Sequence, residues 1–246
     1  MSTTPPPRPA AGRPVTPPVT PPVMPPVTVL ILSGGLDSTV LLYHLRAEGH
    51  RVKALSVNYG QRHGKELAYA RATCERLGVE HRTADLTGIA GLLGQSALVD
   101  PAVAVPHGGY AEANMKATVV PNRNMLMLAA AAAWAIAEKA DHVSFAAHHG
   151  YHTLYPDCKP EFIAAMTTAI LLADWHQVSL VAPFATRTKA DIVRRGADLG
   201  VPFDQTWSCY EGGALHCGRC GTCLERVEAF RTAGVPDPTA YQAADP

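Results

Sequence analysis

Short apolar runs alternate with helix-like segments along most of this 246-residue chain. The apolar runs, which are typical of buried strands, lie at 27–32, 52–58, 81–86, 142–147 and 178–182. Helical periodicity or composition marks the segments 36–48, 65–77, 123–139, 161–173 and 189–199, with a further short helix near 111–117. This order predicts an α/β fold, a doubly wound, Rossmann-like parallel sheet with helices on both faces. Ligands bind at the carboxyl ends of the strands in such sheets.

Two segments flank the predicted sheet domain of residues 28–205. Residues 1–27 are rich in proline and repeat Val-Thr-Pro-Pro, so we expect a disordered or polyproline-like tail. Met24 lies just before the first strand, which leaves translation start sites at Met1 and at Met24 open. Residues 206–246 hold four of the six cysteines and predict a small metal-binding, partly helical segment.

Composition excludes some classes of protein. Lys and Arg together number 21, as do Asp and Glu, so no net positive charge favours a dedicated nucleic-acid binder. The longest apolar stretch, 125–137, is too short for a membrane span, and the N-terminus lacks a secretory pattern. We therefore expect a cytoplasmic protein without membrane or nucleic-acid partners. The sequence leaves the oligomeric state open, a homodimer included.

A glycine-containing loop follows the first predicted strand and opens a helix. Its sequence is Ser33-Gly34-Gly35-Leu36-Asp37-Ser38-Thr39. The two glycines let backbone amides approach an anion, and the helix start favours negative charge. Ser38 and Thr39 can donate hydrogen bonds from their hydroxyl groups to phosphates, while Asp37 can hold a magnesium ion. We assign Asp37, Ser33 and Ser38 to the reaction, and keep a simple strand–helix turn capped by Ser33 as the structural alternative.

The heptad S-G-G-L-D-S-T resembles the PP-loop of the ATP pyrophosphatase superfamily. It is neither a Walker loop nor a G-x-G-x-x-G fingerprint. The resemblance implies that ATP is cleaved between its α and β phosphates and that AMP passes to an oxygen of the substrate. The ATP-binding residues are then expected to be Leu32, Ser33, Gly34, Gly35, Leu36, Asp37, Ser38, Thr39, Val40, Leu41 and Leu42.

Four cysteines are crowded near the C-terminus with the spacing C-x7-C-x2-C-x2-C. They are Cys209, Cys217, Cys220 and Cys223. Four thiolates close a tetrahedral structural zinc site, which is the favoured interpretation. An iron–sulfur cluster stays open, because C-x2-C-x2-C also begins the ferredoxin run. His216 is expected to be a bystander.

Other polar residues follow predicted strands or begin helices. Gln61 and Arg62 are expected to face the same crevice as the phosphate loop. Arg123 can clamp a carboxylate or phosphate, with Asn122 as a simple helix cap, and Lys189 can donate to phosphates. A metal site or a nucleophile was weighed for the residues after the fourth strand, and their roles stay open: His148, His149, His152, Asp157 and Cys158.

Together, the motifs of this chain resemble the QueC family of 7-cyano-7-deazaguanine synthases. They are S-G-G-L-D-S-T, Y-G-Q-R-H at 59–63, V-P-N-R-N at 120–124, Y-P-D-C-K-P-E-F-I at 155–163, S-C-Y at 208–210 and H-C-G-R-C-G-T-C-L-E-R at 216–226. They follow the family order across residues 28–235. The chain departs at Lys159, where the family often has Arg, and in the histidine-rich stretch 148–152, where an acidic residue is common.

The resemblance implies a reaction and its ligands. ATP with Mg²⁺ would activate the carboxylate of 7-carboxy-7-deazaguanine, ammonia would form an amide, and a second activation would eliminate to the nitrile. Free ammonium is the expected nitrogen source, because no glutaminase module fits the remaining length. The four cysteines would bind one structural Zn²⁺. Tyr155, Asp157 and Lys159 would contact the substrate.

Two other classes of protein and one other pathway remain as alternatives. A tRNA-thiolating PP-loop enzyme would need a basic RNA surface, which zero net charge disfavours. A zinc-ribbon module without catalysis would be expected to lose Asp37 or Ser33, and both are present. A third alternative keeps the chemistry but feeds a deazapurine secondary metabolite rather than tRNA queuosine.

Overall fold

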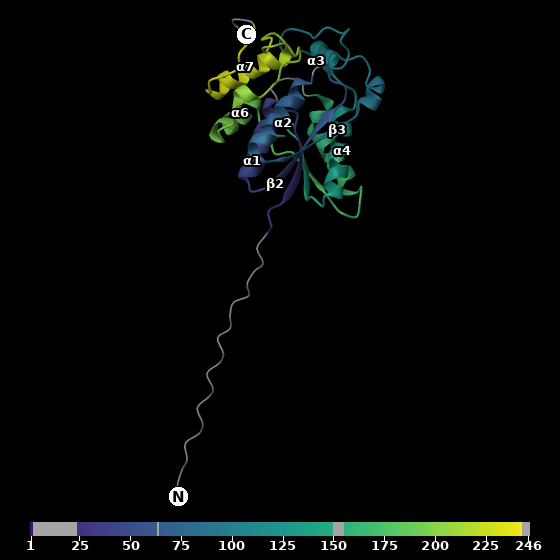
Figure 1. Ribbon diagram of the computed structural model, residues 1–246, viewed down its shortest axis with the longest axis vertical. Coiled ribbons are helices and arrows are strands. Elements are labelled where there is room, and N and C mark those ends of the chain that lie inside the picture. The colour runs from purple at the N-terminus through teal and green to yellow at the C-terminus, as the bar shows by residue number, and fades with distance from the viewer. Residues whose placement is uncertain (2–23, 63, 150–154, 243–246) are drawn as a thin grey trace.

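The structure is a computed structural model that describes residue 1 and residues 24–62, 64–149 and 155–242 (Figure 1). The predicted proline-rich tail lies almost wholly outside these residues, as does His152. No helix in the described part of the chain is long and apolar enough to cross a membrane.

Five parallel strands form one sheet in the order β3-β2-β1-β4-β5. The strands are β1 Val27–Ile31, β2 Arg51–Asn58, β3 Glu80–Asp85, β4 His142–Ser144 and β5 Ser179–Val181. The chain winds outward from β1 to β3 and then returns to β4 on the other side of β1. This reversal beside β1 is the topological switch point where doubly wound sheets bind ligands. The predicted fold class is confirmed.

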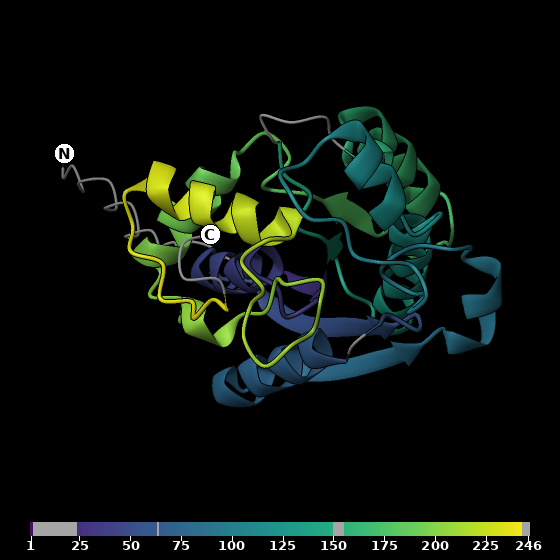
Figure 2. The ribbon, with the colours of Figure 1, turned by 90° about the horizontal axis from the view of Figure 1, so that it is seen from above.

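Helices cover both faces of the sheet. They are α1 Leu36–Ala47, α2 Lys65–Leu77, α3 Glu112–Thr118, α4 Arg123–Ala137, α5 Pro160–Leu171, α6 Lys189–Asp198 and α7 Gly221–Ala233, with 3-10 turns η1 Thr87–Leu92, η2 Pro156–Cys158 and η3 Phe203–Gln205. Residues of α4 and α5 pack in one apolar cluster with β1 and β4, represented by Leu128 and Val143. Residues of α1, α2, α6 and α7 pack in the other (Figure 2).

The fourth strand is shorter than the predicted run 142–147. Its pairing with β5 stops at Ser144, opposite Val181, so the next residues leave the sheet. Phe145, Ala146 and Ala147 instead line a pocket at the carboxyl edge of the strands. An apolar run can thus continue past its strand, because a pocket wall buries side chains as a sheet does.

The C-terminal segment is packed into the sheet domain through α7. Ala229 and Phe230 of this helix belong to the same apolar cluster as α1 and α6. The side chain of Arg226 is fully buried, and it donates hydrogen bonds to Thr206 Oγ1 and to the Phe203 carbonyl, each at 2.9 Å. The cysteines that precede α7 are therefore held against the sheet rather than on a free appendage.

Candidate functional site

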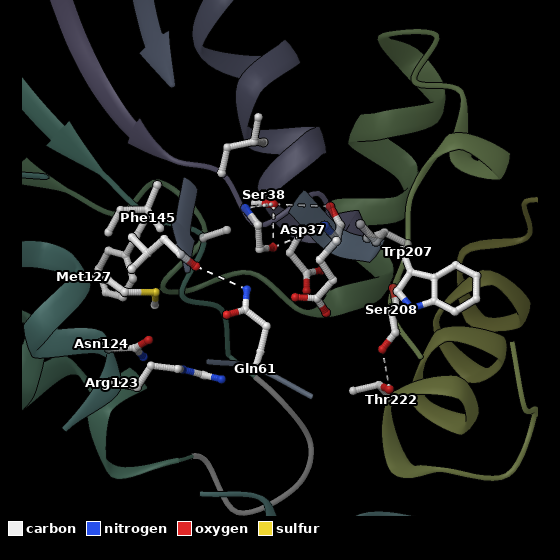
Figure 3. Close-up of a pocket in the computed structure, with 18 of the residues that line it drawn as sticks. Asp37, Ser38, Gln61, Arg123, Asn124, Met127, Phe145, Trp207, Ser208 and Thr222 are labelled. Carbon is white, nitrogen blue, oxygen red and sulfur yellow. Dashed lines mark hydrogen bonds between the residues drawn. The ribbon is translucent and has the colours of Figure 1, made fainter. Parts of the chain in front are cut away.

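A pocket of about 260 Å³ opens at the carboxyl edge of the sheet. Its walls come from the loops after β1, β2 and β4, from the starts of α4 and α6, and from the cysteine-rich segment. Figure 3 shows Arg123, Met127 and Phe145 on one side, Trp207, Ser208 and Thr222 on the other, and Asp37 and Ser38 between them. The phosphate loop and the C-terminal segment, far apart in sequence, thus form one site.

The phosphate loop is organised by its two serines. The hydroxyl groups of Ser33 and Ser38 lie 3.0 Å apart, and the amide of Gly35 donates to Ser33 Oγ at 3.2 Å. The N-cap residue of α1 is Gly35 rather than Ser33, so no side chain caps this helix. The two serines therefore hold the shape of the loop that faces the pocket, and Ser33 does not act as the cap of α1.

Gly34 is the position in this loop that only glycine can fill. Its φ is +85°, and a Cβ there would lie 2.2 Å from the carbonyl oxygen of Glu66. The first turn of α2 therefore packs directly on the phosphate loop.

Apart from Gly34, which does not line the pocket, the predicted ATP-binding residues divide into two groups. Those that line the pocket are Leu32, Ser33, Gly35, Leu36, Asp37 and Ser38. Thr39, Val40, Leu41 and Leu42 are fully buried in α1, and the last three belong to the apolar core. The structure does not bring these four side chains to the pocket.

Asp37, Lys189 and Glu225 form a half-buried charge cluster at the pocket. Lys189 Nζ lies 3.2 Å from Asp37 Oδ2 and 2.6 Å from Glu225 Oε2. His148 Nε2 lies 3.9 Å from the same Asp37 oxygen. Burial by itself would raise the pKa of Asp37, but the charge of Lys189, followed by that of His148, holds it below its usual value. The carboxylate is therefore ionised, and the two carboxylates raise the pKa of Lys189 so that it stays charged.

The helix start of α6 fixes Lys189. Thr188 caps this helix, accepting from the Asp191 amide at 3.2 Å, while the Thr188 amide donates to Asp191 Oδ2 at 3.0 Å. This capping box orients the first turn, so Lys189 projects toward Asp37 from a fixed backbone.

Gln61 and Arg62 both follow β2, but only Gln61 lines the main pocket. Gln61 lines the pocket, but its amide donates to the Val57 carbonyl at 3.2 Å and accepts from the Tyr59 amide at 3.0 Å, which shapes the loop. Arg62 donates instead to the Val103 carbonyl at 2.9 Å and does not line the main pocket. The carbonyl groups of the loop at 97–103 accept from its guanidinium, and Arg62 lines a smaller adjoining cavity, which Gln61 and Arg123 also line, rather than the pocket of the phosphate loop.

Arg123 lies in the pocket wall at the first turn of α4. Its guanidinium lies 6.0 Å from the centre of the Tyr59 ring, and its Nε is buried without a hydrogen-bond partner among the described residues. Asn122 precedes it with a φ of +59° and makes no side-chain cap. The Asn122 cap was therefore a wrong expectation.

The Y-P-D-C segment lies beside the pocket, and one of its side chains enters the wall. Cys158 lines the pocket, whereas Tyr155, Asp157 and Lys159 do not. Tyr155 shares a 2.8 Å hydrogen bond with Thr118, the Asp157 carbonyl accepts from Asn124, and Lys159 is exposed. Burial raises the pKa of the Cys158 thiol to about 11, which leaves it protonated and a poor nucleophile near neutral pH.

The histidines after β4 do not form a metal site within the described residues. His148 faces Asp37, while His149 is exposed and donates its amide to the Arg187 carbonyl. His152 lies outside the described residues. In the part of the chain that the structure describes, the cysteines are the residues grouped as metal ligands.

The four predicted cysteine ligands converge. The sulfur atoms of Cys209, Cys217, Cys220 and Cys223 all lie within 4.8 Å of one another and are buried. The Cys217–Cys223 and Cys220–Cys223 sulfur separations are 3.9 and 3.5 Å. Metal–sulfur bonds of about 2.3 Å in a tetrahedron place sulfur atoms roughly 3.8 Å apart, so this donor set suits a tetrahedral metal ion. His216 is not among them: its Nε2 accepts from the Ser208 amide at 3.2 Å.

The cysteine segment also makes a wall of the pocket. Along the extended stretch after η3, Cys209 belongs to the metal-ligand group while its neighbours Ser208 and Tyr210 line the pocket. Thr222, between two of the cysteines, donates to the Ser208 carbonyl at 2.7 Å. Cysteines that could hold a metal ion and pocket residues therefore alternate along one short piece of chain.

Several pocket residues were not singled out from sequence. They are Glu66, Asn124, Met127, Phe145, Trp207, Ser208, Tyr210 and Thr222, with Glu225 behind Lys189. Ser208, Tyr210 and Thr222 flank predicted ligands, so alternation about the cysteines was a usable signal. Glu225 and Glu66 carried no such local signal, because their roles depend on which loops meet at the switch point.

Comparisons with known proteins agree with these motifs. Residues 27–234 match the family described as "Queuosine biosynthesis protein QueC". The chain is 54% identical over 219 residues to "7-cyano-7-deazaguanine synthase" of Allorhizobium ampelinum, covering 88% of this chain and 93% of that protein. It is 49% identical over 214 residues to the enzyme of the same name from Caldicellulosiruptor bescii, covering 87% and 96%.

Among solved structures, the U34-tRNA thiolase NcsA from Methanococcus maripaludis with its [4Fe-4S] cluster is similar at 16% identity and a TM-score of 0.45, over 89% of this chain and 75% of that one. The family is decided by the sequence matches, which span the phosphate loop, the pocket and the cysteines alike. This chain belongs to the QueC family of 7-cyano-7-deazaguanine synthases.

Proposed function

We propose that this enzyme converts 7-carboxy-7-deazaguanine and ammonia to 7-cyano-7-deazaguanine at the expense of ATP. The observation that carries the proposal is the joining of Ser33, Asp37 and Lys189 in one pocket, together with the family relationship. Loop amides and hydroxyl groups suit phosphate oxygens, and Lys189 adds a positive charge where a phosphate leaving group departs.

The reaction needs two expulsions of oxygen from the same carbon. A carboxylate oxygen attacks the α-phosphorus of ATP and pyrophosphate leaves, which makes an acyl-adenylate. Ammonia then attacks the acyl carbon, and AMP leaves with that oxygen. A second ATP then adenylates the amide oxygen, with loss of pyrophosphate and of one proton from nitrogen, and departure of AMP with loss of the remaining N–H proton gives the nitrile. The pocket residues hold the two reactants together and stabilise the negative charge of the leaving groups.

Asp37 is the residue that fits a magnesium ion. Its Oδ2 faces Lys189, but its Oδ1 is buried and has no hydrogen-bond partner in the described part of the chain. A Mg²⁺ ion bound there would neutralise phosphate charge. The four cysteines would hold one structural Zn²⁺, because four thiolates leave no open coordination position.

Incubation with ATP, Mg²⁺, ammonium and the carboxylate should yield the nitrile by mass spectrometry, together with AMP and pyrophosphate. Asp37→Asn should lower kcat/KM by about 100- to 1000-fold. Asp204→Asn, at an exposed position outside the pocket, is the matched control and should leave it unchanged. No nitrile from folded, zinc-replete protein would refute the proposal.

A further inference from the structure

Glu66 and Arg123 are oppositely charged residues of the pocket that do not pair with each other. Both line the main pocket and also a smaller adjoining cavity of about 40 Å³. Among the described residues, the Glu66 carboxylate accepts no hydrogen bond and forms no ion pair within 4.0 Å. Arg123 likewise forms no ion pair there, and its Nε is buried without a partner. Both groups are available to a ligand between them.

The backbone at both residues is held firmly, although neither charged group forms an ion pair with a described residue and Arg123 interacts with the Tyr59 side chain. The Glu66 carbonyl packs against Gly34 of the phosphate loop. Asn124, directly after Arg123, is buried and donates to the Asp157 carbonyl at 3.1 Å. The spacing between the acceptor and the donor is therefore set by the fold, as a recognition site requires.

The pocket that Glu66 and Arg123 line also has apolar and aromatic residues in its wall. Val57, Met127 and Phe145 line the pocket together with the rings of Tyr59 and Tyr210. In Figure 3, Met127 and Phe145 lie above Arg123 on the same side, and the Arg123 side chain extends toward Gln61. Such walls suit the faces of a flat heterocycle, with the charged groups left for its edge.

The raised pKa of the Glu66 carboxyl group agrees with its lack of hydrogen-bond donors among the described residues. Burial raises the pKa of its carboxyl group to about 7, although the Arg123 charge acts to lower it. A ligand that brings N–H groups to this carboxylate would supply the hydrogen bonds that the protein does not.

We propose that Glu66 and Arg123 read the edge of the deazaguanine ring, Glu66 accepting from N1–H and the 2-amino group and Arg123 donating to O6. This inference rests on the proposed function and names the substrate contacts that decide specificity. A guanine edge offers two adjacent donors beside one acceptor, which matches a carboxylate beside a guanidinium. An adenine edge lacks the paired donors, so the same residues would discriminate against it.

Steady-state kinetics with two substrates tests the assignment. Wild-type enzyme should prefer 7-carboxy-7-deazaguanine over the analogue without the 2-amino group by about 10- to 100-fold in kcat/KM, the value of a hydrogen bond to a charged acceptor. Glu66→Gln should raise the KM for the natural carboxylate by about tenfold or more and reduce this preference, with the KM for ATP unchanged. Arg123→Lys, which keeps the charge but loses the planar fork, should also raise the carboxylate KM.

Glu75→Gln on the exposed side of the same helix is the matched control, and it should behave as wild type. Wild-type preference retained by folded Glu66→Gln would overturn the inference while leaving nitrile formation intact. A rise in the KM for ATP alone would assign Glu66 to adenine and would overturn it too. Failure of the wild-type enzyme to make nitrile would instead reject the proposed function.

Discussion

The backbone amide of Trp207 donates a hydrogen bond to the carbonyl of Gly34 over 3.0 Å. Gly34 belongs to the glycine-containing loop at 33–39, and Trp207 comes two residues before Cys209, the first of the four cysteines that could hold a metal ion. The Trp207 ring is buried, and its Nε1 donates to the Cys209 carbonyl at 2.9 Å. The metal segment and the phosphate loop are thus joined through one residue, so loss of the metal should reach the nucleotide site.

Removal of the metal should weaken ATP binding as well as folding. Without an ion the Cys209 and Cys220 segments lose their shared anchor, and the Ser208–Trp207 wall is no longer held on the loop. A Cys220→Ala variant should lose at least about 3 kcal/mol, which lowers Tm by roughly 6–12 °C in a chain of this size. Calorimetry with ATP and metal analysis check this.

The metal experiment has a matched control in Cys74→Ala. Cys74 is buried in α2, away from the metal-ligand group, and should keep one metal ion per chain. A metal-free, folded protein that binds ATP with wild-type Kd would contradict the coupling. Iron and sulfide in place of about one zinc would change the identity of the metal centre.

Gly34→Ala should lower the free energy of unfolding by more than the strain of an alanine in the left-handed backbone region explains. An alanine Cβ would meet the Glu66 carbonyl at 2.2 Å, so α2 must shift away from the loop. Gly49→Ala is matched in φ, at +86° against +85°, but has nothing within 4 Å of the added Cβ. We expect Gly49→Ala to lose about 1–2 kcal/mol with normal ATP binding. Gly34→Ala should lose more and bind ATP weakly; equal urea midpoints and Kd values would refute the close-packing argument.

Lys189→Met should leave two carboxylates facing each other without their shared cation. The Lys189 side chain is only 12% exposed, so an uncompensated charge here should lower the free energy of unfolding by about 3–5 kcal/mol. The double variant with Glu225→Gln should regain part of that stability but none of the turnover, because Lys189 would still be missing from the phosphates. Urea unfolding and nitrile formation separate the two effects. Wild-type turnover by Lys189→Met would remove Lys189 from the mechanism.

Glu66 should make the protein less stable as pH rises from about 4.5 to about 7. Its carboxyl pKa is about 7 in the folded protein against an ordinary 4.5, so in this window the native state binds more protons than the unfolded state. Glu66→Gln lacks this titration. Relative to the wild type, the free energy of unfolding of the variant should therefore rise by about 1–3 kcal/mol across this pH window. Urea unfolding at several pH values measures this difference. A difference that is constant with pH would show that Glu66 has an ordinary pKa.

Local patterns in the sequence predicted the strand–helix order, the glycine-containing loop after the first strand and the cysteine cluster that could hold a metal ion. Each depends on nearby residues: apolar runs make strands, Gly34 and Gly35 free the backbone, and C-x2-C steps bring two thiolates to one ion. Several predicted elements run one or two residues past their ends in the structure, and the fourth strand runs three residues too far because its apolar run passes from strand to pocket wall at Phe145.

Only the tertiary structure decided which side chains meet at the switch point. Arg62 and Arg123 both looked like anion-binding residues, yet Arg62 is taken by the carbonyl groups of a loop, while Arg123 lies in the pocket. Glu225 joins Asp37 through Lys189 because α7 packs on α6, which no local pattern encodes. Residue type fixes what a side chain can bind, but long-range packing decides which partner reaches it first, so the members of the site emerge only when the sheet brings its loops together.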